Sequence, residues 1–286
     1  MTQYPQWLKR SFSPDGTRRY VSALVDELGL STVCESALCP NLLECWSLRQ
    51  LTFMILGERC TRRCGFCAVS TARPQPVDPS EPARLAEAVR RLGLRHVVIT
   101  SVARDDMPDE GTGHFIAVIA AVRQANPGVT VEVLVPDFHA RPELIERVVG
   151  EGRPEVFAHN IETVERLSRA VRPQAGYRRS LQTLRLAAAQ PQRPIVKSGM
   201  MVGLGETAQE ICAVLDDLRE VGVTHLTIGQ YLRPTPAHLP VVEYVAPARF
   251  DDYERLAHER GMAWVKSGPF VRSSYHAIDA LESVER

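Results

Sequence analysis

The chain has 286 residues, and its 34 Lys and Arg residues balance 34 Asp and Glu residues. This length allows one large α/β domain whose core needs no disulfide staple. The balanced charge gives no reason to expect binding to nucleic acid or to an anionic membrane, and the sequence has no apolar run of membrane-spanning length. The N-terminal stretch MTQYPQWLKRSFSPDGTRRY lacks the apolar core of a signal peptide, so we expect a cytoplasmic protein.

Short apolar runs alternate with amphipathic segments along most of the chain. A short helix is predicted over residues 20–28, ahead of the first strand. The predicted strands cover residues 51–56, 96–101, 130–136, 155–160, 195–202 and 225–232. The predicted helices cover residues 82–92, 113–125, 142–150, 161–172, 177–189, 207–221 and 249–260.

Strand-then-helix units in sequence predict a parallel sheet with right-handed crossovers. Six such units fall short of the eight that close a full barrel, so we expect an α/β fold built on a partial (β/α)6 TIM-like barrel. Residues 51–246 would form the barrel, residues 1–50 an N-terminal extension and residues 247–286 a C-terminal extension. Because no internal repeat or long linker divides the chain, the three parts are expected to form one compact unit.

Six of the seven cysteines fall into two triplets, of which the second is Cys60, Cys64 and Cys67. Its spacing is C-x3-C-x2-C, and it follows the first predicted strand, where parallel α/β folds carry their chemistry. Three thiolates in one loop can bind three irons of a cubane cluster, which leaves the fourth iron open to a substrate. A zinc site is the alternative, but zinc normally needs four ligands in a closed tetrahedron.

The first triplet is Cys34, Cys39 and Cys45, with the spacing C-x4-C-x5-C, which is unusual for zinc fingers or ribbons. Both triplets stand within known motifs. The second resembles the signature of the radical S-adenosylmethionine superfamily, whose open iron chelates S-adenosylmethionine and generates a 5′-deoxyadenosyl radical. The first, within VCESALCPNLLECW, resembles the N-terminal motif of lipoyl synthases, which carry an auxiliary [4Fe–4S] cluster on three such cysteines.

The resemblance to lipoyl synthases covers nearly the whole chain. Its motifs occur in order as PQWLK, TFMILGERCTRRCGFCAV, EPARLAEAV, LRHVVITSVARDDMPDEGTGHF, LVPDF, HNIETVERL, VRPQAGYRRSL, VKSGMMVGLGET, LTIGQYLRPT and SGPFVRSSYHA. On this resemblance the chain is identified as a member of that family.

The resemblance implies two [4Fe–4S] clusters and S-adenosylmethionine as cofactors. The radical-generating cluster would be held by Cys60, Cys64 and Cys67. The auxiliary cluster would be held by Cys34, Cys39, Cys45 and a serine of the RSSY motif, for which we choose the second serine, Ser274. From residue chemistry alone, the alternative is that Ser273 or Ser274 caps a short helix over residues 275–282.

The resemblance also implies the reaction, which inserts two sulfur atoms at C6 and C8 of a lysine-bound octanoyl chain to give a lipoyl group. No protein base can deprotonate such carbons, so a radical is required, and the auxiliary cluster would be consumed as the sulfur donor. The implied partners are octanoylated lipoyl carrier domains (2-oxoacid dehydrogenase E2 subunits and the glycine-cleavage H protein), reduced ferredoxin or flavodoxin, and iron–sulfur cluster assembly or carrier proteins.

Six residues outside the triplets are candidates for contact with S-adenosylmethionine, namely Asn160, Glu162, Lys197, Gly203, Gly205 and Glu206. Each has a structural alternative. Asn160 could cap the helix that follows it. The glycines and Glu206 could form a strand-to-helix turn with an acidic residue at the helix N-terminus. Lys197 could pair with a carboxylate inside the barrel or extend to the surface.

The chain departs from the family pattern in three places. ARDD stands where members often have DRDD, so Ala103 lacks a carboxylate, which weakens any role of that position. Arg104, Asp105 and Asp106, which follow it, are candidate ligands near the charged methionine end of the cofactor. DEGTG replaces a more usual DGGA, and PDFHA lacks the usual glycine after PDF. Two rival hypotheses are a biotin-synthase-like radical enzyme and a zinc-stabilised binding module without catalysis.

Overall fold

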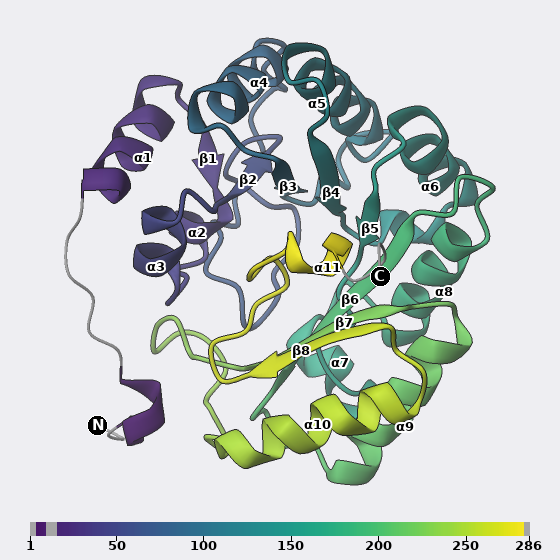
Figure 1. The fold of residues 1–286 in the computed structure, drawn as a ribbon. Coiled ribbons are helices and arrows are strands. Elements are labelled where there is room, and N and C mark those ends of the chain that lie inside the picture. Colours follow the sequence, from purple (N-terminus) through teal and green to yellow (C-terminus); the bar gives the residue numbers. More distant parts are fainter. Residues whose placement is uncertain (1–3, 10–15, 283–286) are drawn as a thin grey trace.

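The computed structural model describes residues 4–9 and 16–282, and its centre is one eight-stranded sheet (Figure 1). The strands, in chain order and in sheet order, are β1 (Ser31–Thr32), β2 (Thr52–Ile55), β3 (His96–Ser101), β4 (Thr130–Leu134), β5 (Val156–Ala158), β6 (Ile195–Val202), β7 (His225–Gln230) and β8 (Trp264–Gly268). Strands β2 to β8 run parallel, and β1 pairs antiparallel with β2. Within the described residues no pairing joins β8 to β1, so the sheet curls without closing, which confirms the predicted partial barrel.

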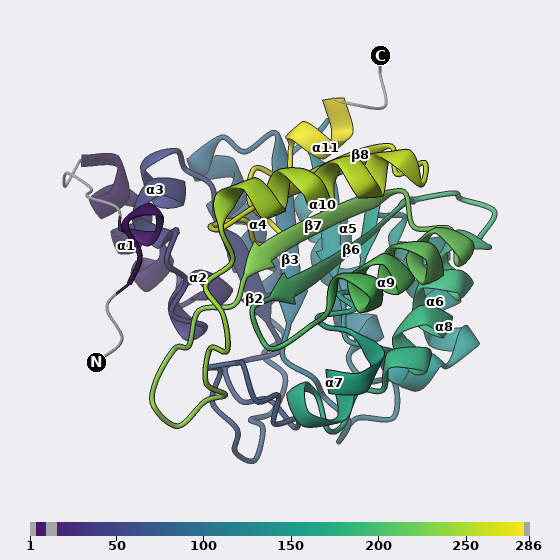
Figure 2. The ribbon, with the colours of Figure 1, turned by 90° about the horizontal axis from the view of Figure 1, so that it is seen from below.

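Helices cover the outer face of the sheet (Figures 1 and 2). They are α4 (Glu81–Leu92), α5 (Thr112–Ala125), α6 (Pro142–Arg147) with the π-helical turn η3 (Val148–Gly152), α7 (Glu165–Val171), α8 (Tyr177–Ala188), α9 (Ala208–Glu220) and α10 (Pro247–Glu259). Helix α9 begins at a capping box of Thr207 and Glu210 and buries the face formed by Ile211, Val214, Leu215 and Leu218. Among the described residues, none of the helices combines the length and the apolar surface that spanning a membrane requires.

Short elements lie beside the barrel or within its loops. Three helices precede β2 and stand beside the edge of the sheet in Figure 1: α1 (Gly16–Glu27), α2 (Val33–Ser36) and α3 (Leu42–Ser47). Two 3-10 turns are η1 (Gln6–Leu8) and η2 (Phe138–Ala140). The first two cysteines of the first triplet therefore come before β2 on α2 and the turn after it, and Cys45 lies on α3.

After β8 the chain folds back along the inside of the sheet to α11 (Asp279–Glu282), which Figure 2 shows at the end of the sheet away from the arrowheads of β6 and β7. We call residues 269–281 the C-terminal tail. Two glycines leave room for it. A Cβ on Gly229 of β7 would collide with the carbonyl oxygen of Val271, and one on Gly199 of β6 would lie 2.9 Å from Ser273 Oγ. The tail can pass inside the barrel because these strands lack side chains there.

The structure corrects the predictions in several places. Strands β1 and β8 were not predicted, because β1 has two residues and β8 is a short segment that is only partly buried. Helix α7 begins at Glu165, so the interpretation of Asn160 as its N-cap is wrong. Helix α11 begins at Asp279, so neither serine of the RSSY motif caps it.

The predicted boundaries at residues 50 and 246 stay predictions. Strands β1 and β8 come from the two predicted extensions, yet both belong to the same sheet as the barrel strands. Residues 1–3, 10–15 and 283–286 of the extensions lie outside the described residues.

One ion pair is fully buried inside the barrel. Lys197 Nζ of β6 donates to both carboxylate oxygens of Glu132 of β4, at 2.9 and 3.1 Å. Burial opposes ionisation of Glu132, but Lys197 and His96 outweigh it and hold the pKa of this carboxyl below its usual range. Lys197 therefore pairs with a carboxylate inside the barrel and does not extend to the surface.

Replacing Lys197 alone should destabilise the protein strongly. Lys197→Met leaves the Glu132 carboxylate buried without its cation, and we expect a loss of about 3–5 kcal/mol in the free energy of unfolding. The double variant Lys197→Met/Glu132→Leu should regain most of this loss, because no isolated charge remains. Urea denaturation of the cluster-free proteins measures both effects, and equal stability of the single and double variants would contradict the expectation.

Candidate active site

The carboxyl ends of the parallel strands surround a cavity of about 550 Å³, here called the first cavity. Cys60, Cys64 and Cys67 all line it. Its other walls are largely apolar and include Met54, Leu134, Val135, Met200 and Met201. The second cysteine triplet thus lies at the end of the sheet where parallel α/β folds bind their ligands.

Arg62, which lies within the second triplet, anchors its loop to the barrel. Its guanidinium donates to both carboxylate oxygens of Asp105, at 2.8–3.1 Å, and forms an ion pair of 2.7 Å with Asp137. Burial alone would raise the pKa of Asp137, but Arg62 and its other basic neighbours lower it to about 2. The amides of Arg62 and Ala103 donate to Cys60 Sγ at 3.4 and 3.3 Å. Arg62 is a site residue that the sequence analysis missed.

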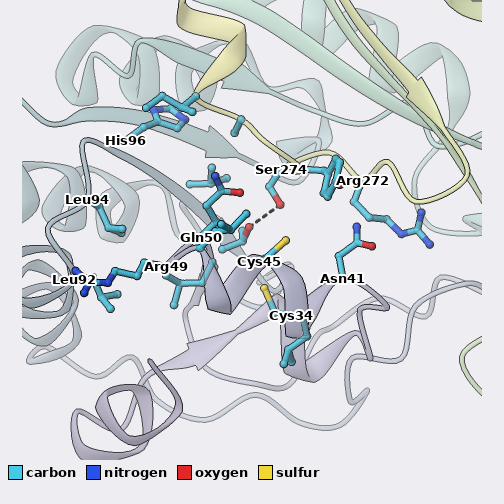
Figure 3. A pocket seen from close by; sticks show the side chains of 18 of the residues that line it. Cys34, Asn41, Cys45, Arg49, Gln50, Leu92, Leu94, His96, Arg272 and Ser274 are labelled. Carbon is cyan, nitrogen blue, oxygen red and sulfur yellow. Dashed lines mark hydrogen bonds between the residues drawn. The ribbon is translucent and has the colours of Figure 1, made fainter. Parts of the chain in front are cut away.

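A second cavity, of about 300 Å³, lies against the amino ends of β2 and β3. It is lined by all three cysteines of the first triplet and by Ser274, together with residues such as Asn41, Gln50 and Leu94 (Figure 3). In Figure 3 the sulfur atoms of Cys34 and Cys45 and the hydroxyl of Ser274 turn toward one another. The structure therefore brings Ser274 next to cysteines that lie more than two hundred positions earlier in the chain.

The two serines of the RSSY motif have different surroundings. Ser274 Oγ accepts a hydrogen bond of 2.7 Å from Thr52 Oγ1 and lines both cavities. Ser273 Oγ accepts one of 2.7 Å from Asn160 Nδ2 and lines the first cavity. Of the two, Ser274 is the one that shares the second cavity with the three cysteines of the first triplet.

Two further hydrogen bonds hold the C-terminal tail against the first triplet. Asn41 Nδ2 donates to the carbonyl oxygen of Phe270 at 2.6 Å, and the Tyr275 hydroxyl donates to Glu44 Oε1 at 3.0 Å. Both hydrogen bonds join the tail to α3, because Asn41 is the residue before the helix and Glu44 lies within it. Sequence reasoning missed Asn41 and Glu44, although Tyr275 belongs to the RSSY motif.

The wall between the two cavities is shared. The residues that line both are Cys34, Cys39, Thr52, Arg272 and Ser274. A ligand in the first cavity can therefore lie next to side chains of both triplets, which is the geometry that a transfer between the two sites needs.

Among the described residues, the sulfur atoms of neither triplet lie close enough together to bind a single metal ion. In a tetrahedral zinc site the sulfur atoms would be about 3.8 Å apart, given zinc–sulfur bonds of about 2.3 Å. Among the described residues, Asp105, Glu110 and His139 are the group whose potential ligand atoms lie within 4.8 Å of one another, and neither cysteine triplet meets this limit. A cubane cluster binds each thiolate to a different iron, which keeps the sulfurs farther apart.

Asn160 and Glu162 line the first cavity, as a contact with S-adenosylmethionine would require. Asn160 Nδ2 donates to Glu162 Oε1 at 2.9 Å, while Asn160 Oδ1 is buried and has no hydrogen-bond partner within the described residues. Burial raises the pKa of Glu162, which the nearby Arg172 partly offsets. Arg172, another residue that the sequence analysis missed, donates to the Asn160 carbonyl at 2.9 Å and also lines the cavity.

The other four candidates do not line either cavity. Lys197 is engaged with Glu132. Glu206 Oε2 accepts hydrogen bonds from the amides of Gly203 and Leu204, at 2.9 and 3.0 Å, within its own turn. A Cβ on Gly203 would lie 2.5 Å from the Glu243 carbonyl oxygen, so this glycine is needed for packing. Contact of Lys197, Gly203, Gly205 or Glu206 with S-adenosylmethionine stays a prediction.

Two residues that depart from the family pattern are in contact. Glu110 stands in DEGTG and His139 in PDFHA, and Glu110 Oε1 lies 2.9 Å from His139 Nδ1. Both residues have a φ of 49°, in the left-handed region that favours glycine. Asp105, a candidate cofactor ligand in the sequence analysis, forms an ion pair with Arg62, and Arg104 is paired with Asp106 at 2.9 Å.

The fold is similar to that of several solved structures. The FeFe-hydrogenase maturase HydG from Carboxydothermus hydrogenoformans is similar with a TM-score of 0.59 and 12% identity, covering 94% of this chain and 79% of that one. Streptococcus suis SuiB bound to S-adenosylmethionine is similar with a TM-score of 0.57 and 11% identity, covering 79% and 53%. Residues 54–228 match the model of the Radical SAM superfamily. The chain is therefore a radical S-adenosylmethionine protein.

Relatives at higher identity define the family more narrowly. A lipoyl synthase of Rubrobacter xylanophilus is 54% identical over 283 residues, which cover 99% of this chain and 88% of that protein. One from Caldanaerobacter subterraneus is 53% identical over 274 residues, covering 96% and 95%. One from Thermus thermophilus is 52% identical over 288 aligned positions, covering 99% and 88%. The chain belongs to the lipoyl synthase family.

Burial raises the pKa of Cys34 to about 11, that of Cys64 to about 12 and that of Cys67 to about 11. Without metal these thiols are neutral near pH 7, so loading a cluster must release their protons. An acid with a raised pKa stabilises the folded state below its unfolded pKa, and this contribution is lost as the pH rises through its folded pKa.

The cluster-free protein should therefore lose stability as the pH rises from about 9 to about 11. Cys34→Ser should make this decline shallower, by on the order of 2 kcal/mol across the range, because serine does not titrate there. Urea denaturation under anaerobic, reducing conditions at several pH values measures the slope. An identical slope in the wild type and the variant would show that the Cys34 thiol is not desolvated in the folded state.

Proposed function

We propose that this protein inserts sulfur at C6 and C8 of a protein-bound octanoyl-lysine, giving lipoyl-lysine, with S-adenosylmethionine and two [4Fe–4S] clusters. Membership of the lipoyl synthase family supports the reaction, and the match to the Radical SAM superfamily supports the use of S-adenosylmethionine and an iron–sulfur cluster. The observation that carries the two-cluster proposal is the pair of cavities, each lined by one complete cysteine triplet and separated by a shared wall.

When bound, the cluster of the first cavity supplies the electron that generates a radical from S-adenosylmethionine, and the auxiliary cluster supplies sulfur. The residues of the chain bind and orient these groups. Cys60, Cys64 and Cys67 would hold three irons and leave the fourth for the cofactor. Asn160 offers an unpaired acceptor, Oδ1, to a donor group of S-adenosylmethionine, and the neighbouring Glu162 lies beside it on the same wall.

Cys34, Cys39, Cys45 and Ser274 would hold the auxiliary cluster. Serine oxygen is a hard ligand and suits a soft iron–sulfur centre less well than a thiolate does, so an iron held by Ser274 would be the easiest to release. The methionine and aliphatic walls of the first cavity suit an octanoyl chain, because they exclude water from an apolar ligand. Such a chain can lie against the shared wall and face both triplets.

The substrate is an octanoylated protein. We propose that the carriers are lipoyl domains of 2-oxoacid dehydrogenase E2 subunits and the glycine-cleavage H protein. We further propose reduced ferredoxin or flavodoxin as the electron donor and iron–sulfur assembly or carrier proteins as the source of new auxiliary clusters. A cytoplasmic location is proposed as well, because clustered cysteines that bind metal are typical of a reducing compartment.

Variants of the two triplets should separate the two steps. Cys39→Ala should still form 5′-deoxyadenosine from S-adenosylmethionine but give no sulfur-containing product, whereas Cys64→Ala should form neither. An anaerobic assay with dithionite and an octanoyl-lysyl peptide, read by mass spectrometry, measures both compounds. Identical behaviour of the two variants would contradict the division of roles. Formation of 5′-deoxyadenosine by the wild type without any sulfur product would contradict the proposed reaction.

The two serines provide a matched test of the fourth ligand. The reconstituted wild type should hold about eight irons for two four-iron clusters. Ser274→Ala should lose about one iron from the auxiliary cluster, because its oxygen ligand is gone, while Ser273→Ala should retain the wild-type iron content. Iron analysis and electron paramagnetic resonance measure the difference. If Ser273→Ala loses the iron and Ser274→Ala does not, the assignment of the ligand is reversed.

A further inference from the structure

Thr52, the first residue of β2, contacts two of the four groups proposed to hold the auxiliary cluster. Its backbone amide interacts with the sulfur of Cys34, and both residues line the second cavity. Its hydroxyl forms a hydrogen bond of 2.7 Å with Ser274 Oγ, drawn as the dashed line that reaches Ser274 in Figure 3. Thr52 thus joins a helix before the barrel to the C-terminal tail.

The position of Thr52 is set by the sheet. The residue is 2% exposed, and it pairs with Val98 of β3 in the parallel ladder. On the other side, the next residue, Phe53, pairs with Thr32 of β1. Ser274, in contrast, lies in a segment of turns between β8 and α11. A hydrogen bond from a sheet residue can therefore fix a side chain whose own backbone is not held by regular secondary structure.

The direction of this hydrogen bond follows from the chemistry of the ligand. A serine that binds iron through its deprotonated oxygen has no proton to donate, so its oxygen can only accept. The Thr52 hydroxyl must then be the donor, and a hydrogen bond to an oxygen that carries negative charge is stronger than one between two neutral hydroxyls. The contact between Thr52 and Ser274 becomes stronger when Ser274 acts as a ligand.

We propose that Thr52 is a positioning residue of the auxiliary site, whose hydroxyl holds Ser274 Oγ toward Cys34, Cys39 and Cys45 and so retains the iron bound there. This inference rests on the proposed function, because it takes Ser274 as the fourth ligand. It adds a residue that touches no iron and acts through the serine.

Thr52→Val tests the proposal, because valine has nearly the shape of threonine but cannot donate a hydrogen bond. Thr52→Ser restores the hydroxyl and serves as the rescue variant. The matched control is Thr183→Val. Thr183 lines neither cavity, and its buried hydroxyl donates a hydrogen bond to the Asp137 carbonyl at 2.9 Å. Each substitution is made in the full chain carrying Cys60→Ala, Cys64→Ala and Cys67→Ala, so that only the auxiliary site can load a cluster.

The measurement is the loss of one iron to a chelator, followed by iron analysis and, after oxidation with ferricyanide, by the electron paramagnetic resonance signal of an oxidised three-iron cluster. We expect Thr52→Val to lose this iron about five to ten times faster than the parent, and Thr52→Ser and Thr183→Val to match the parent. Equal rates for Thr52→Val and the parent would overturn the proposal. So would equally fast loss from Thr52→Ser, because this would point to packing of the methyl group and not to the hydroxyl.

Ser274→Ala in the same background separates this proposal from the proposed function. If Ser274→Ala loses the iron quickly and Thr52→Val does not, Ser274 is the ligand and only the role of Thr52 is wrong. If Ser274→Ala retains the iron as the parent does, Ser274 is not a ligand and the assignment of the auxiliary site itself fails. Fast loss in both variants with rescue by Thr52→Ser supports both statements.

Discussion

The C-terminal tail can reach the second cavity only because the barrel is open and its inner face is locally bare. Gly199 and Gly229 remove the side chains that would block the tail on β6 and β7. Farther along, His225 Nε2 lies 3.1 Å from the carbonyl oxygen of Ala280 and holds the end of the tail against β7. This path brings Ser274 to the cysteines of the first triplet, so the second cavity exists as a product of tertiary packing and not of any local motif.

The two triplets are held in place by different kinds of interaction. Arg62 fixes the loop of the second triplet through ion pairs with Asp105 and Asp137, which follow β3 and β4. Such pairs are strong when they are buried and fully bonded, and they resist displacement. Around the first triplet, hydrogen bonds of Asn41 with Phe270 and of Tyr275 with Glu44 hold the tail in place.

Much of the barrel could be predicted, because its strands and helices carry strong hydrophobic periodicity and the cysteine spacing is specific. Strand β8 escaped prediction because Lys266 and Gly268 weaken its apolar pattern, and its place depends on pairing with β7. Thr52 carried no local signal, since it reads as the start of an apolar strand. Its importance appears only when the tail folds back beside it. Arg62 lay within the recognised motif, but its partners come from two other loops.

The pairing of Glu110 with His139 explains how the chain tolerates its departures from the family pattern. A non-glycine residue in the left-handed region costs about 1–2 kcal/mol, and here Glu110, His139 and Ala140 all adopt positive φ. A glycine at such a position would avoid this cost but would offer no side chain. The hydrogen bond of 2.9 Å between Glu110 and His139 recovers part of the cost and ties the loop after β3 to the loop after β4. Arg62 bridges the same two loops through Asp105 and Asp137, so the Glu110–His139 contact adds a second connection between the loops that anchor Arg62.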